Sequence, residues 1–560
     1  MHSLRRTLLS TAAKSRRKIT RRPEQSIRCM SIIDKPSDEK MVPKFQIPKG
    51  IMGQPTCHTH PHMIPPDFLT CGITQMEYKE RREILVQKLL LEVNNVHKSH
   101  IIVIPAAHKQ YMSDKIPYVF RQNSDFFYLT GCLEPAAVLV IIKPAQTDNF
   151  KSILFVHDKD SHAELWEGPR TGCASAAKLF AVDEARPIDN FATYMANLAT
   201  PSRPLILWYN QSSNPELSLL LAPLRQAGAT SGDPQKALHM MRSIKSPAEK
   251  ELMKETCYIG SQAINMAMAV TKPGVCEHYL TAVLDYSARV AGAEHPAFPP
   301  VVAGGARATH IHYVTNNQLL TGEDMVLVDS GTAFNFIHGS TKPPTQKGTV
   351  ALKRKRLIHI LGEHRPALDS LFDTMCRLLG THLQQEGILP RNIDGNDLIG
   401  KAYRLCPHHV SHYLGLDVHD TPLVRRHLPV KTDMVVTVEP GAFTVTAGLR
   451  AFIPAELVTL HLCIYIRPDD TSVPPEFRGI GIRIEDDVLI TDSEPVVLTE
   501  SCVKEVHDIE AIVGKHSIAA RTVVQQAATA SASVDPESSP SSVNSQRLTI
   551  NIMIMNLLAF

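Results

Sequence analysis

The sequence predicts two consecutive folded domains, an α/β layer over residues 66–237 and a larger domain of mixed helices and strands over residues 238–515. The first domain is indicated by short apolar runs, such as HIIVIP (100–105), that alternate with helical patterns. The second begins near a helix signal at residues 246–249, where a capping serine precedes a proline and an acid. Its apolar runs end in acids or glycine turns, as in MVLVDSG (325–331).

The first domain is expected to begin with a long helix at residues 75–93, because Leu85 and Leu89 recur at a period near four residues. FFYLTG (126–131) and ELWEGPR (164–170) are interpreted as loops whose aromatic rings pack at the ends of strands. Apolar runs separated by helical patterns predict strands at residues 100–105, 136–142, 152–156 and 204–209.

The second domain is expected to contain helices that start after the signal at residues 246–249 and at residues 277–292 and 367–387. The last of these helices carries seven apolar side chains on one face: Leu368, Leu371, Phe372, Met375, Leu378, Leu379 and Leu383. Apolar runs predict buried strands at residues 298–305, 325–331, 434–441 and 481–490.

Composition and charge restrict the class of protein. The 560 residues are 43% hydrophobic and 21% charged, as in an ordinary globular chain with a large core. The net charge is +3, yet residues 1–22 alone carry eight Lys or Arg and no acid. The rest of the chain is therefore mildly acidic, which gives no reason to expect nucleic-acid binding. No run of about eighteen apolar residues occurs, so no membrane span is predicted.

Both ends of the chain are expected to lie outside the folded domains. Residues 1–30 are Arg-rich and lack a continuous apolar core, which predicts a mitochondrial transit peptide, with a disordered basic tail as the alternative. Residues 31–65 are expected to be a loosely structured lead-in, and the Ala-, Ser- and Thr-rich residues 516–560 a disordered tail. Eleven scattered cysteines without a CxxC pair fit a reducing compartment.

The stretch CPHHVSHYLGLDVHDTP (406–422) contains an unusual density of histidines. It places His408 and His412 four residues apart, and His412 and His419 seven apart, with Gly415 between the latter two. Imidazole is both a good metal ligand and a group that titrates near neutral pH, so the stretch indicates metal-assisted proton chemistry. The alternative interpretation is a turn with solvated histidines.

Three acids in the same domain form a candidate metal site together with His412. Asp329, Glu439 and Glu485 each follow an apolar run that would bury them, and a buried carboxylate is costly unless it is paired or binds a cation. Several carboxylates with one imidazole suit Mn²⁺ better than zinc, and such ions activate water for amide hydrolysis. His312 is a candidate for oxyanion stabilisation, and His419 is a candidate for proton transfer.

Five motifs, in order along the second domain, carry a family resemblance: VVAGG…HIHYVTNNQL, MVLVDSG, CPHHVSHYLGLDVHDTP, VTVEPG and FRGIGIRIEDD. Together they resemble the motif series of the pita-bread metallopeptidases, and among these the Xaa-Pro aminopeptidases of the aminopeptidase P family, above all the mitochondrial members. ELWEGPR resembles part of the N-terminal domain of that family. The resemblance implies an α/β N-terminal domain followed by an α+β pita-bread (creatinase/aminopeptidase) catalytic domain.

The resemblance also implies an activity and a set of residue roles. The activity is release of an N-terminal residue that precedes proline from peptides or imported proteins, with two Mn²⁺ ions per chain, in mitochondria, by a homodimer. The implied metal ligands are Asp329, His412, Glu439 and Glu485. The implied catalytic residues are His312, His419 and Arg483, and the implied substrate-binding residues are Phe298, His408 and His419.

Two departures from the family pattern affect this site. The family has a fifth ligand, an aspartate shortly after the first, whereas this chain has no acid over residues 330–362, and Ser340 stands near the expected position. Residues 442–463 are inserted just after the motif that holds Glu439. The abrupt edges of both segments favour an altered splice form or gene model, a hypothesis that sequencing the transcript would test.

These departures leave three interpretations. The first is a Mn²⁺-dependent Xaa-Pro aminopeptidase that holds one metal ion or none tightly. The second is a catalytically impaired relative or splice form that acts as a binding or scaffold protein. The third, prolidase or methionine aminopeptidase on the same fold, is disfavoured, because the HHVSHYLG motif argues against prolidase and the large N-terminal domain against methionine aminopeptidase.

Overall fold

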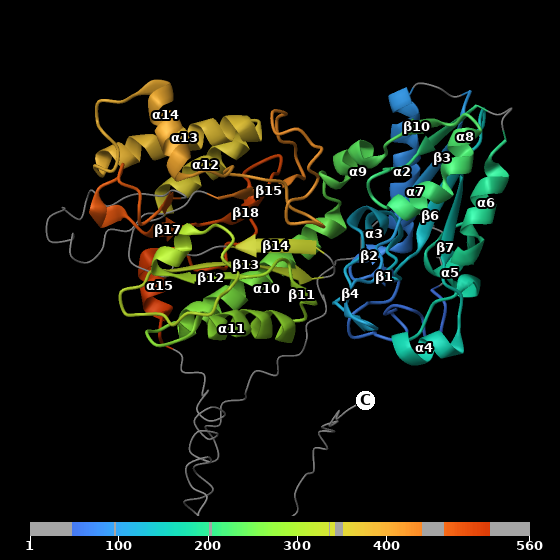
Figure 1. Ribbon diagram of the computed structural model, residues 1–560, viewed down its shortest axis with the longest axis horizontal. Helices are drawn as coiled ribbons and strands as arrows, with labels where there is room; N and C mark the ends of the chain where they lie inside the picture. The colour runs from blue at the N-terminus through green and yellow to red at the C-terminus, as the bar shows by residue number, and fades with distance from the viewer. Residues whose placement is uncertain are drawn as a thin grey trace, which may run out of the picture. The chain divides into compact units, whose positions relative to one another are not determined.

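The computed structural model describes six stretches of the chain: residues 47–93, 97–200, 204–334, 337–341, 351–439 and 464–515 (Figure 1). The predicted transit peptide at residues 1–30, the insert at residues 442–463 and the tail at residues 516–560 lie outside the described residues. Within these six stretches, no helix is long and apolar enough to cross a lipid bilayer.

The first domain is built on a six-stranded mixed sheet with the strand order β10-β9-β3-β6-β7-β8. Its strands are β3 (Ser99–Pro105), β6 (Val138–Lys143), β7 (Lys151–Val156), β8 (Glu184–Pro187), β9 (Leu205–Trp208) and β10 (Thr230–Gly232). β6 runs antiparallel to β3 and β7, whereas β3 and β9, β9 and β10, and β7 and β8 pair in parallel. The four strands predicted from apolar runs are confirmed.

Helices cover both faces of this sheet, as Figure 1 shows. Ile102 and Ile104 of β3 belong to the same core cluster as the predicted helix α2 (Gln75–Val93), whereas Ile101 and Val103 pack with α6 on the opposite face. This period-two alternation of buried residues is typical of a strand covered on both sides. Four further helices of the domain are α5 (Cys173–Leu179), α6 (Phe191–Leu198), α7 (Pro215–Leu220) and α8 (Ala222–Gln226).

Two segments predicted as aromatic loops form short helices instead, so those predictions are wrong. FFYLTG lies in α3 (Ser124–Thr130), which begins where the side chain of Asn123 accepts a hydrogen bond from the N–H of Phe126 at 2.9 Å. ELWEGPR begins inside α4 (Ser161–Glu167). Such short helices show no clear period, and their capping residues carry the signal. Phe126 is fully buried as expected, but Trp166 is 78% exposed and packs at no strand end.

The second domain combines helices with small antiparallel sheets. Its helices are α10 (Pro247–Val270), α11 (Glu277–Val290), α12 (Ala351–His364), α13 (Leu368–Gln385), α14 (Gly395–Leu405) and α15 (Val506–Ile512). One sheet contains β11 (His295–Pro296), β12 (Val301–Gly304), β13 (Val326–Phe334) and β14 (Ile337–Thr341). Another contains β15 (Val435–Val438), β18 (Asp486–Leu489) and β19 (Val496–Val497). The predicted start of α10 is confirmed by a capping box between Ser246 and Glu249.

The segment predicted as one strand at residues 481–490 is two strands in two different sheets, which corrects that prediction. β17 (Ile480–Ile482) pairs with β16 (Ile464–Ile466), whereas β18 pairs with β15. The chain therefore leaves one sheet and enters the other across three residues. Arg483 and Glu485 lie in this break.

Residues 47–65 contain turns and no helix or strand, yet they pack against the first domain. Met52 is buried in the core, and the buried Gln54 donates to the carbonyl oxygen of Gly131 at 3.0 Å. Gln54 also accepts a hydrogen bond from the N–H of Leu133 at 2.8 Å. The second half of the predicted lead-in is thus irregular in secondary structure but fixed by side-chain contacts.

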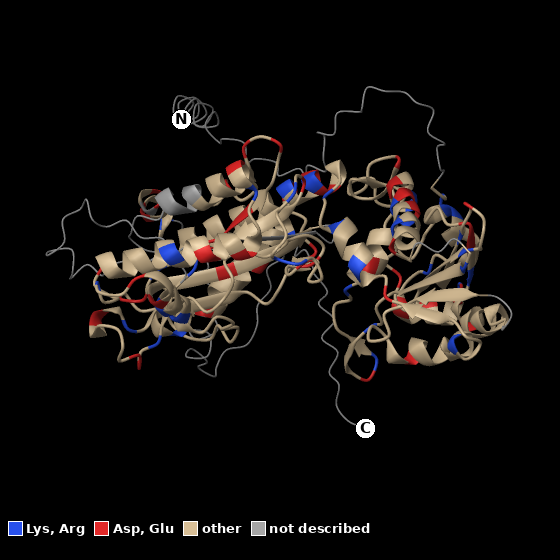
Figure 2. Cartoon of the chain, turned by 90° about the horizontal axis from the view of Figure 1, so that it is seen from above, with Lys and Arg blue, Asp and Glu red and all other residues tan. Residues whose placement is uncertain are grey.

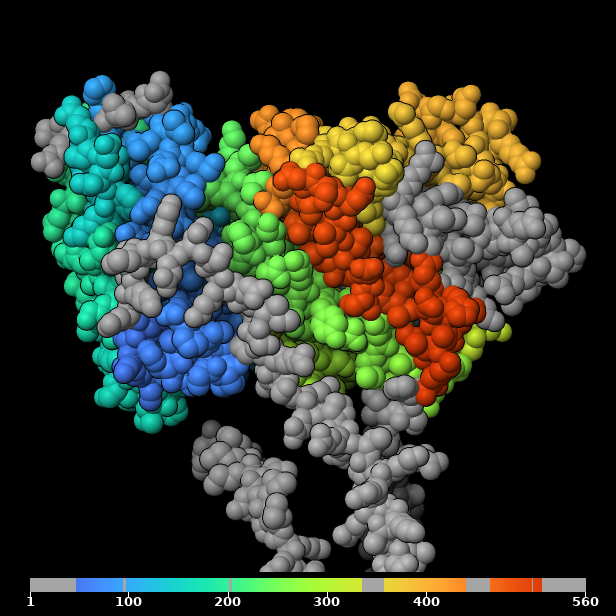
Figure 3. Space-filling view, turned by 180° about the vertical axis from the view of Figure 1, so that it is seen from behind, coloured from blue at the N-terminus to red at the C-terminus, as the bar shows by residue number. Residues whose placement is uncertain are grey.

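The last described segment, residues 464–515, packs against the helix that opens the second domain, as Figure 3 shows by the contact of orange-red and green atoms. Asn265 of α10 donates to the carbonyl oxygen of Ser501 at 2.9 Å and accepts from the N–H of Val503 at 2.9 Å. Acidic and basic residues are interspersed along the described helices (Figure 2), as expected for helices with solvated faces.

An ionic network of six charged residues connects the first domain to the histidine-rich stretch: Arg121, Asp125, Arg242, Lys245, Asp417 and Asp420. Arg242, the last residue of α9 (Gln235–Arg242), donates at 2.7 Å both to Asp125 of α3 and to Asp417, and it also donates to Asp420. Lys245 donates to the other oxygen of Asp420 at 3.0 Å. Because Arg242 and Asp420 are almost fully buried, their charges depend on one another.

Replacing Arg242 with methionine is expected to lower the free energy of unfolding at pH 7 by about 3–5 kcal/mol, because buried carboxylates lose their cation. Burial alone would raise the pKa of Asp420, but Arg242 and Lys245 hold it below its usual value. That stabilisation is present above the unfolded aspartate pKa of about 3.9 and is lost as the pH falls through the lower folded value. In urea denaturation, the difference in the free energy of unfolding between the native chain and Arg242→Met should therefore narrow below pH ~4. A difference that widens there would contradict this account.

Candidate metal centre

Three of the four predicted metal ligands, His412, Glu439 and Glu485, come together in the second domain. Their ligand atoms all lie within 4.8 Å of one another, and all three residues are buried. The register of β15 and β18 pairs Val438 with Asp486, so the neighbouring residues Glu439 and Glu485 meet at the same end of the sheet. The segment with His412 runs beside β15, because the N–H of Thr437 donates to the carbonyl oxygen of His412 at 2.9 Å.

The hydrogen bond of His412 Nδ1 leaves a lone pair on Nε2 that can bind a cation. Nδ1 lies 3.0 Å from the carbonyl oxygen of Tyr413, an acceptor, so Nδ1 carries the proton and donates it. Nε2 therefore offers a lone pair, and it lies 3.0 Å from Oε1 of Glu439. Two acceptors at this distance repel unless a proton or a cation lies between them. The hydroxyl of Thr437 donates to the same Oε1 at 3.0 Å, which orients the carboxylate. This donor set fits a divalent metal ion.

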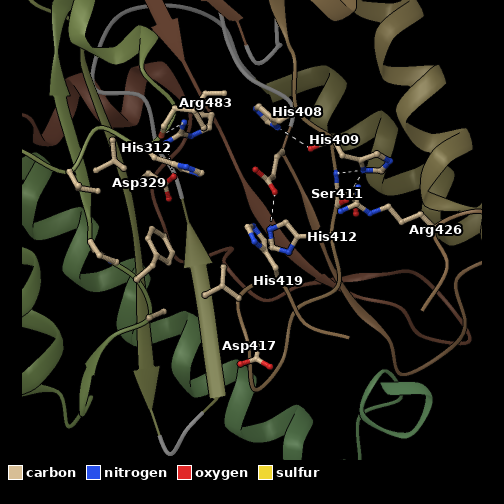
Figure 4. A pocket seen from close by; sticks show the side chains of 18 of the residues that line it. His312, Asp329, His408, His409, Ser411, His412, Asp417, His419, Arg426 and Arg483 are labelled. Atoms are coloured by element: carbon tan, nitrogen blue, oxygen red, sulfur yellow. Dashed lines mark hydrogen bonds and ion pairs between the residues drawn. The ribbon is translucent and has the colours of Figure 1, made fainter. Parts of the chain in front are cut away.

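Asp329, the fourth predicted ligand, does not join the group of three. It lies on β13 and accepts a hydrogen bond from Nη2 of Arg483 at 2.6 Å. Figure 4 shows Asp329, His312 and Arg483 together on one wall of a cavity, across from His412 and His419. A guanidinium buried beside Asp329 compensates its charge. Sequence order alone could not show on which wall of the cavity Asp329 lies.

The backbone register identifies a position on the face of the sheet that carries Asp329. β14 pairs with β13 so that residue 340 lies opposite Gly331, two residues beyond Asp329. Alternate residues of a strand share one face, and cross-strand partners lie on the same face. Position 340, a serine, therefore belongs to the face of the sheet that carries Asp329.

The predicted catalytic and substrate-binding residues border one cavity of about 790 Å³: Phe298, His312, His408, His419 and Arg483. Asp329, His412 and Glu439 also line it, so the three-residue group opens onto this space. The rings of His412 and His419 lie edge to face with centroids 4.6 Å apart. The volume of the cavity lies in the range of pockets that enclose small ligands.

A chain of hydrogen bonds crosses the cavity wall from Arg483 to His408. Nη1 of Arg483 donates to the hydroxyl of Tyr465 at 2.9 Å, and that hydroxyl lies 3.1 Å from Nε2 of His408. Nδ1 of His408 lies 3.0 Å from the carbonyl oxygen of His409, so Nε2 is the acceptor of the Tyr465 proton. Tyr465, which sequence reasoning missed, thus orients two of the predicted site residues.

Glu277 fixes the loop that carries His312. Its buried carboxylate accepts four hydrogen bonds: from Gly304 N at 2.9 Å, Arg307 Nε at 2.8 Å, Tyr313 Oη at 2.9 Å and Gln318 N at 3.0 Å. Burial would raise the pKa of Glu277, but these donors outweigh it and lower that pKa. The carboxylate stays ionised and binds both ends of the loop. Sequence reasoning missed it because Glu277 begins a helix and looks like an ordinary first-turn acid.

His409 is a further cavity residue that the sequence did not single out. Its ring stacks on Phe372 of α13 with centroids 4.8 Å apart, and Nδ1 lies 2.6 Å from the carbonyl oxygen of Ser411. Burial, with a smaller effect from the charge of Arg426, lowers the pKa of His409. A neutral imidazole is therefore expected at this wall near pH 7.

Comparisons with known proteins cover both domains. Residues 78–207 match the aminopeptidase P N-terminal domain, and residues 251–492 match metallopeptidase family M24. Xaa-Pro aminopeptidase 3 of Homo sapiens is 36% identical over 510 residues, which cover 87% of this chain and 96% of the human protein. The mitochondrial intermediate cleaving peptidase 55 of Arabidopsis thaliana is 32% identical, covering 83% of this chain and 88% of the plant protein.

Solved structures agree with these relatives. Zinc-substituted aminopeptidase P of E. coli, in complex with product, matches with a TM-score of 0.66 and 29% identity, covering 79% of this chain and 98% of that chain. The predicted α/β N-terminal domain and pita-bread catalytic domain are thereby confirmed. On this evidence, the chain belongs to the aminopeptidase P group of the M24 metallopeptidases, a family of metal-dependent hydrolases.

Proposed function

We propose that this chain is a Mn²⁺-dependent aminopeptidase that removes an N-terminal residue preceding proline. The observation that carries the proposal is the buried group of His412, Glu439 and Glu485 beside a cavity that His312 and His419 also line. The Xaa-Pro aminopeptidases among its relatives support the substrate class. A divalent ion held by the three residues would polarise the scissile carbonyl and lower the pKa of a bound water.

The chain's own residues would hold the peptide and handle its protons. Phe298 offers an apolar ring at the cavity wall, suited to the pyrrolidine ring of proline. His419 lies beside His412 and would transfer a proton during the reaction. His312, on the opposite wall, would donate to the carbonyl oxygen as negative charge develops there (Figure 4). Arg483 would hold Asp329 in place through its ion pair with that carboxylate.

We further propose that the chain holds one metal ion tightly rather than the family's two. No acid occurs over residues 330–362, and position 340 on the Asp329 face is a serine. Two dications with fewer carboxylates between them repel more strongly. The hydrolysis rate is then reduced. In the extreme case, the chain is a binding or scaffold protein on the same fold, and the same missing acid favours that second candidate.

The proposed location, natural substrates and oligomeric state are inferred in part from the relatives of this chain. The Arg-rich residues 1–22 and the mitochondrial relative support a mitochondrial location, where the substrates would be imported peptides or proteins with proline in second place. A homodimer is proposed from the family resemblance.

A peptide that starts Ala-Pro is expected to be cut at least about tenfold faster than its Ala-Ala counterpart, because only the former fills an apolar proline pocket. The rate should rise with Mn²⁺ and fall after chelation, and metal analysis should give about one ion per chain. Release of free alanine, measured by chromatography, checks the activity. No cleavage at saturating Mn²⁺ would support the scaffold, and two tightly held ions would refute the single-metal proposal.

A further inference from the structure

Two of the three acids of the ionic network lie on either side of His419. Asp417 precedes this histidine by two residues and Asp420 follows it directly, so the network holds the short segment that presents its ring to the cavity. The segment is tightly folded, because a Cβ at Gly415 would lie 2.4 Å from Oδ2 of Asp420. Thr421 also has a positive φ of 49°, a conformation that neighbouring contacts must maintain.

The first domain contributes directly to this hold. Nη2 of Arg121 donates to the carbonyl oxygen of Leu416 at 2.9 Å and to Oδ1 of Asp417 at 2.8 Å. The hydroxyl of Ser124, in α3, donates to the same Oδ1 at 2.7 Å. Arg121 itself borders the cavity with Asp417 and His419. Burial would raise the pKa of Asp417, but Arg242 and Arg121 hold it well below its usual value, so it stays charged at neutral pH.

We propose that Arg121 is a positioning residue that acts through Asp417 and Leu416 on the placement of His419, so that the first domain sets the rate of hydrolysis. Arg121 is distinguished from Arg242 by its exposure. The side chain of Arg121 is 44% exposed, whereas that of Arg242 is 3% exposed. Ion pairs as exposed as Arg121–Asp417 add little to stability, so losing Arg121 should leave the fold intact. The proposal rests on the function proposed above.

The test compares Arg121→Met with Arg121→Lys and with a matched control, Arg289→Met. Arg289 forms a similarly exposed ion pair with Asp285 on α11, away from the cavity. The side chain of Arg289 is 49% exposed and that of Asp285 is 40% exposed. Since a misplaced catalytic group costs up to about 100-fold in rate, we expect Arg121→Met to lower kcat about tenfold with KM changed less than about twofold. Arg121→Lys should recover part of kcat, because lysine keeps the charge, but its flexible ammonium replaces the fixed Nη2 that makes both contacts. Arg289→Met should keep the native kcat and KM, and all three variants the native melting temperature.

A second readout does not depend on catalysis. Hydrogen exchange, measured by mass spectrometry on a peptide that covers residues 412–422, should become faster in Arg121→Met and stay native in Arg289→Met. Native kcat together with native exchange in Arg121→Met would overturn the proposal, and so would a loss explained entirely by a lower melting temperature. If the native chain hydrolyses no Xaa-Pro peptide, the proposed function is wrong, and unchanged exchange would separately show that Arg121 does not hold this segment.

Discussion

Replacing His412 with alanine is expected to abolish both metal retention and peptidase activity. The substitution removes the only nitrogen ligand of the His412–Glu439–Glu485 group and leaves two buried carboxylates facing each other. Since the loss of residues that merely orient a ligand costs about 10–100-fold in metal affinity, the loss of the ligand itself should exceed about 100-fold. Metal content after desalting and kcat/KM for an Ala-Pro peptide measure the two effects.

The matched control for His412→Ala is Asp369→Asn. Asp369 is a half-exposed acid 3.5 Å from the cavity histidine His409 and outside the group of three. The Asp369→Asn variant should retain its metal and most of its peptidase activity. If His412→Ala held as much Mn²⁺ as the native chain, the metal site would have to be placed elsewhere.

Replacing Ser340 with aspartate is expected to raise the metal content from about one ion per chain to about two, and to raise kcat/KM by at least about tenfold. The new carboxylate would stand on the face of the sheet that carries Asp329, as the pairing of residue 340 with Gly331 requires. It would supply the negative charge that a second dication needs. Metal analysis of the purified variant gives the stoichiometry, and competition with a chelator gives the affinity of each ion.

The strand itself provides the control for Ser340→Asp. Thr341 lies one residue further and pairs with Ser330, so an aspartate placed there belongs to the other face. Thr341→Asp adds the same charge and should bind no second ion. An equal gain from both variants would mean that charge alone, and not position, recruits the metal.

The sequence predicted the regular elements of the fold well wherever periodicity was strong. Residues 75–93 form α2 with the predicted bounds, and the apolar face of α13 is buried as expected, as with Leu371 and Leu379. The failures have a local cause. The short helices α3 and α4 were predicted as loops, because they are too short to show a helical period. The single strand expected at residues 481–490 is divided between two sheets, because composition does not indicate with which strand each half will pair.

The candidate site was predictable as a set of residues but not as a geometry. Motif order identified His412, Glu439 and Glu485, and these three do converge. Motif order also predicted Asp329 as a member of this group, but Asp329 lies on the facing wall, where Arg483 donates to it. Arg121 gave no signal, because its partners lie almost three hundred positions away along the chain. Contacts of that span depend on how domains dock, which no local pattern encodes.

The carboxylate of Glu277 has a consequence for when the His312 loop becomes ordered. Four donors between Gly304 and Gln318 converge on one buried anion, so the loop loses its conformational freedom when the domain folds. An arriving peptide then meets a rigid wall and does not bear the entropic cost of ordering it. The shape of this wall is therefore set during folding, and it does not adapt to each substrate that enters.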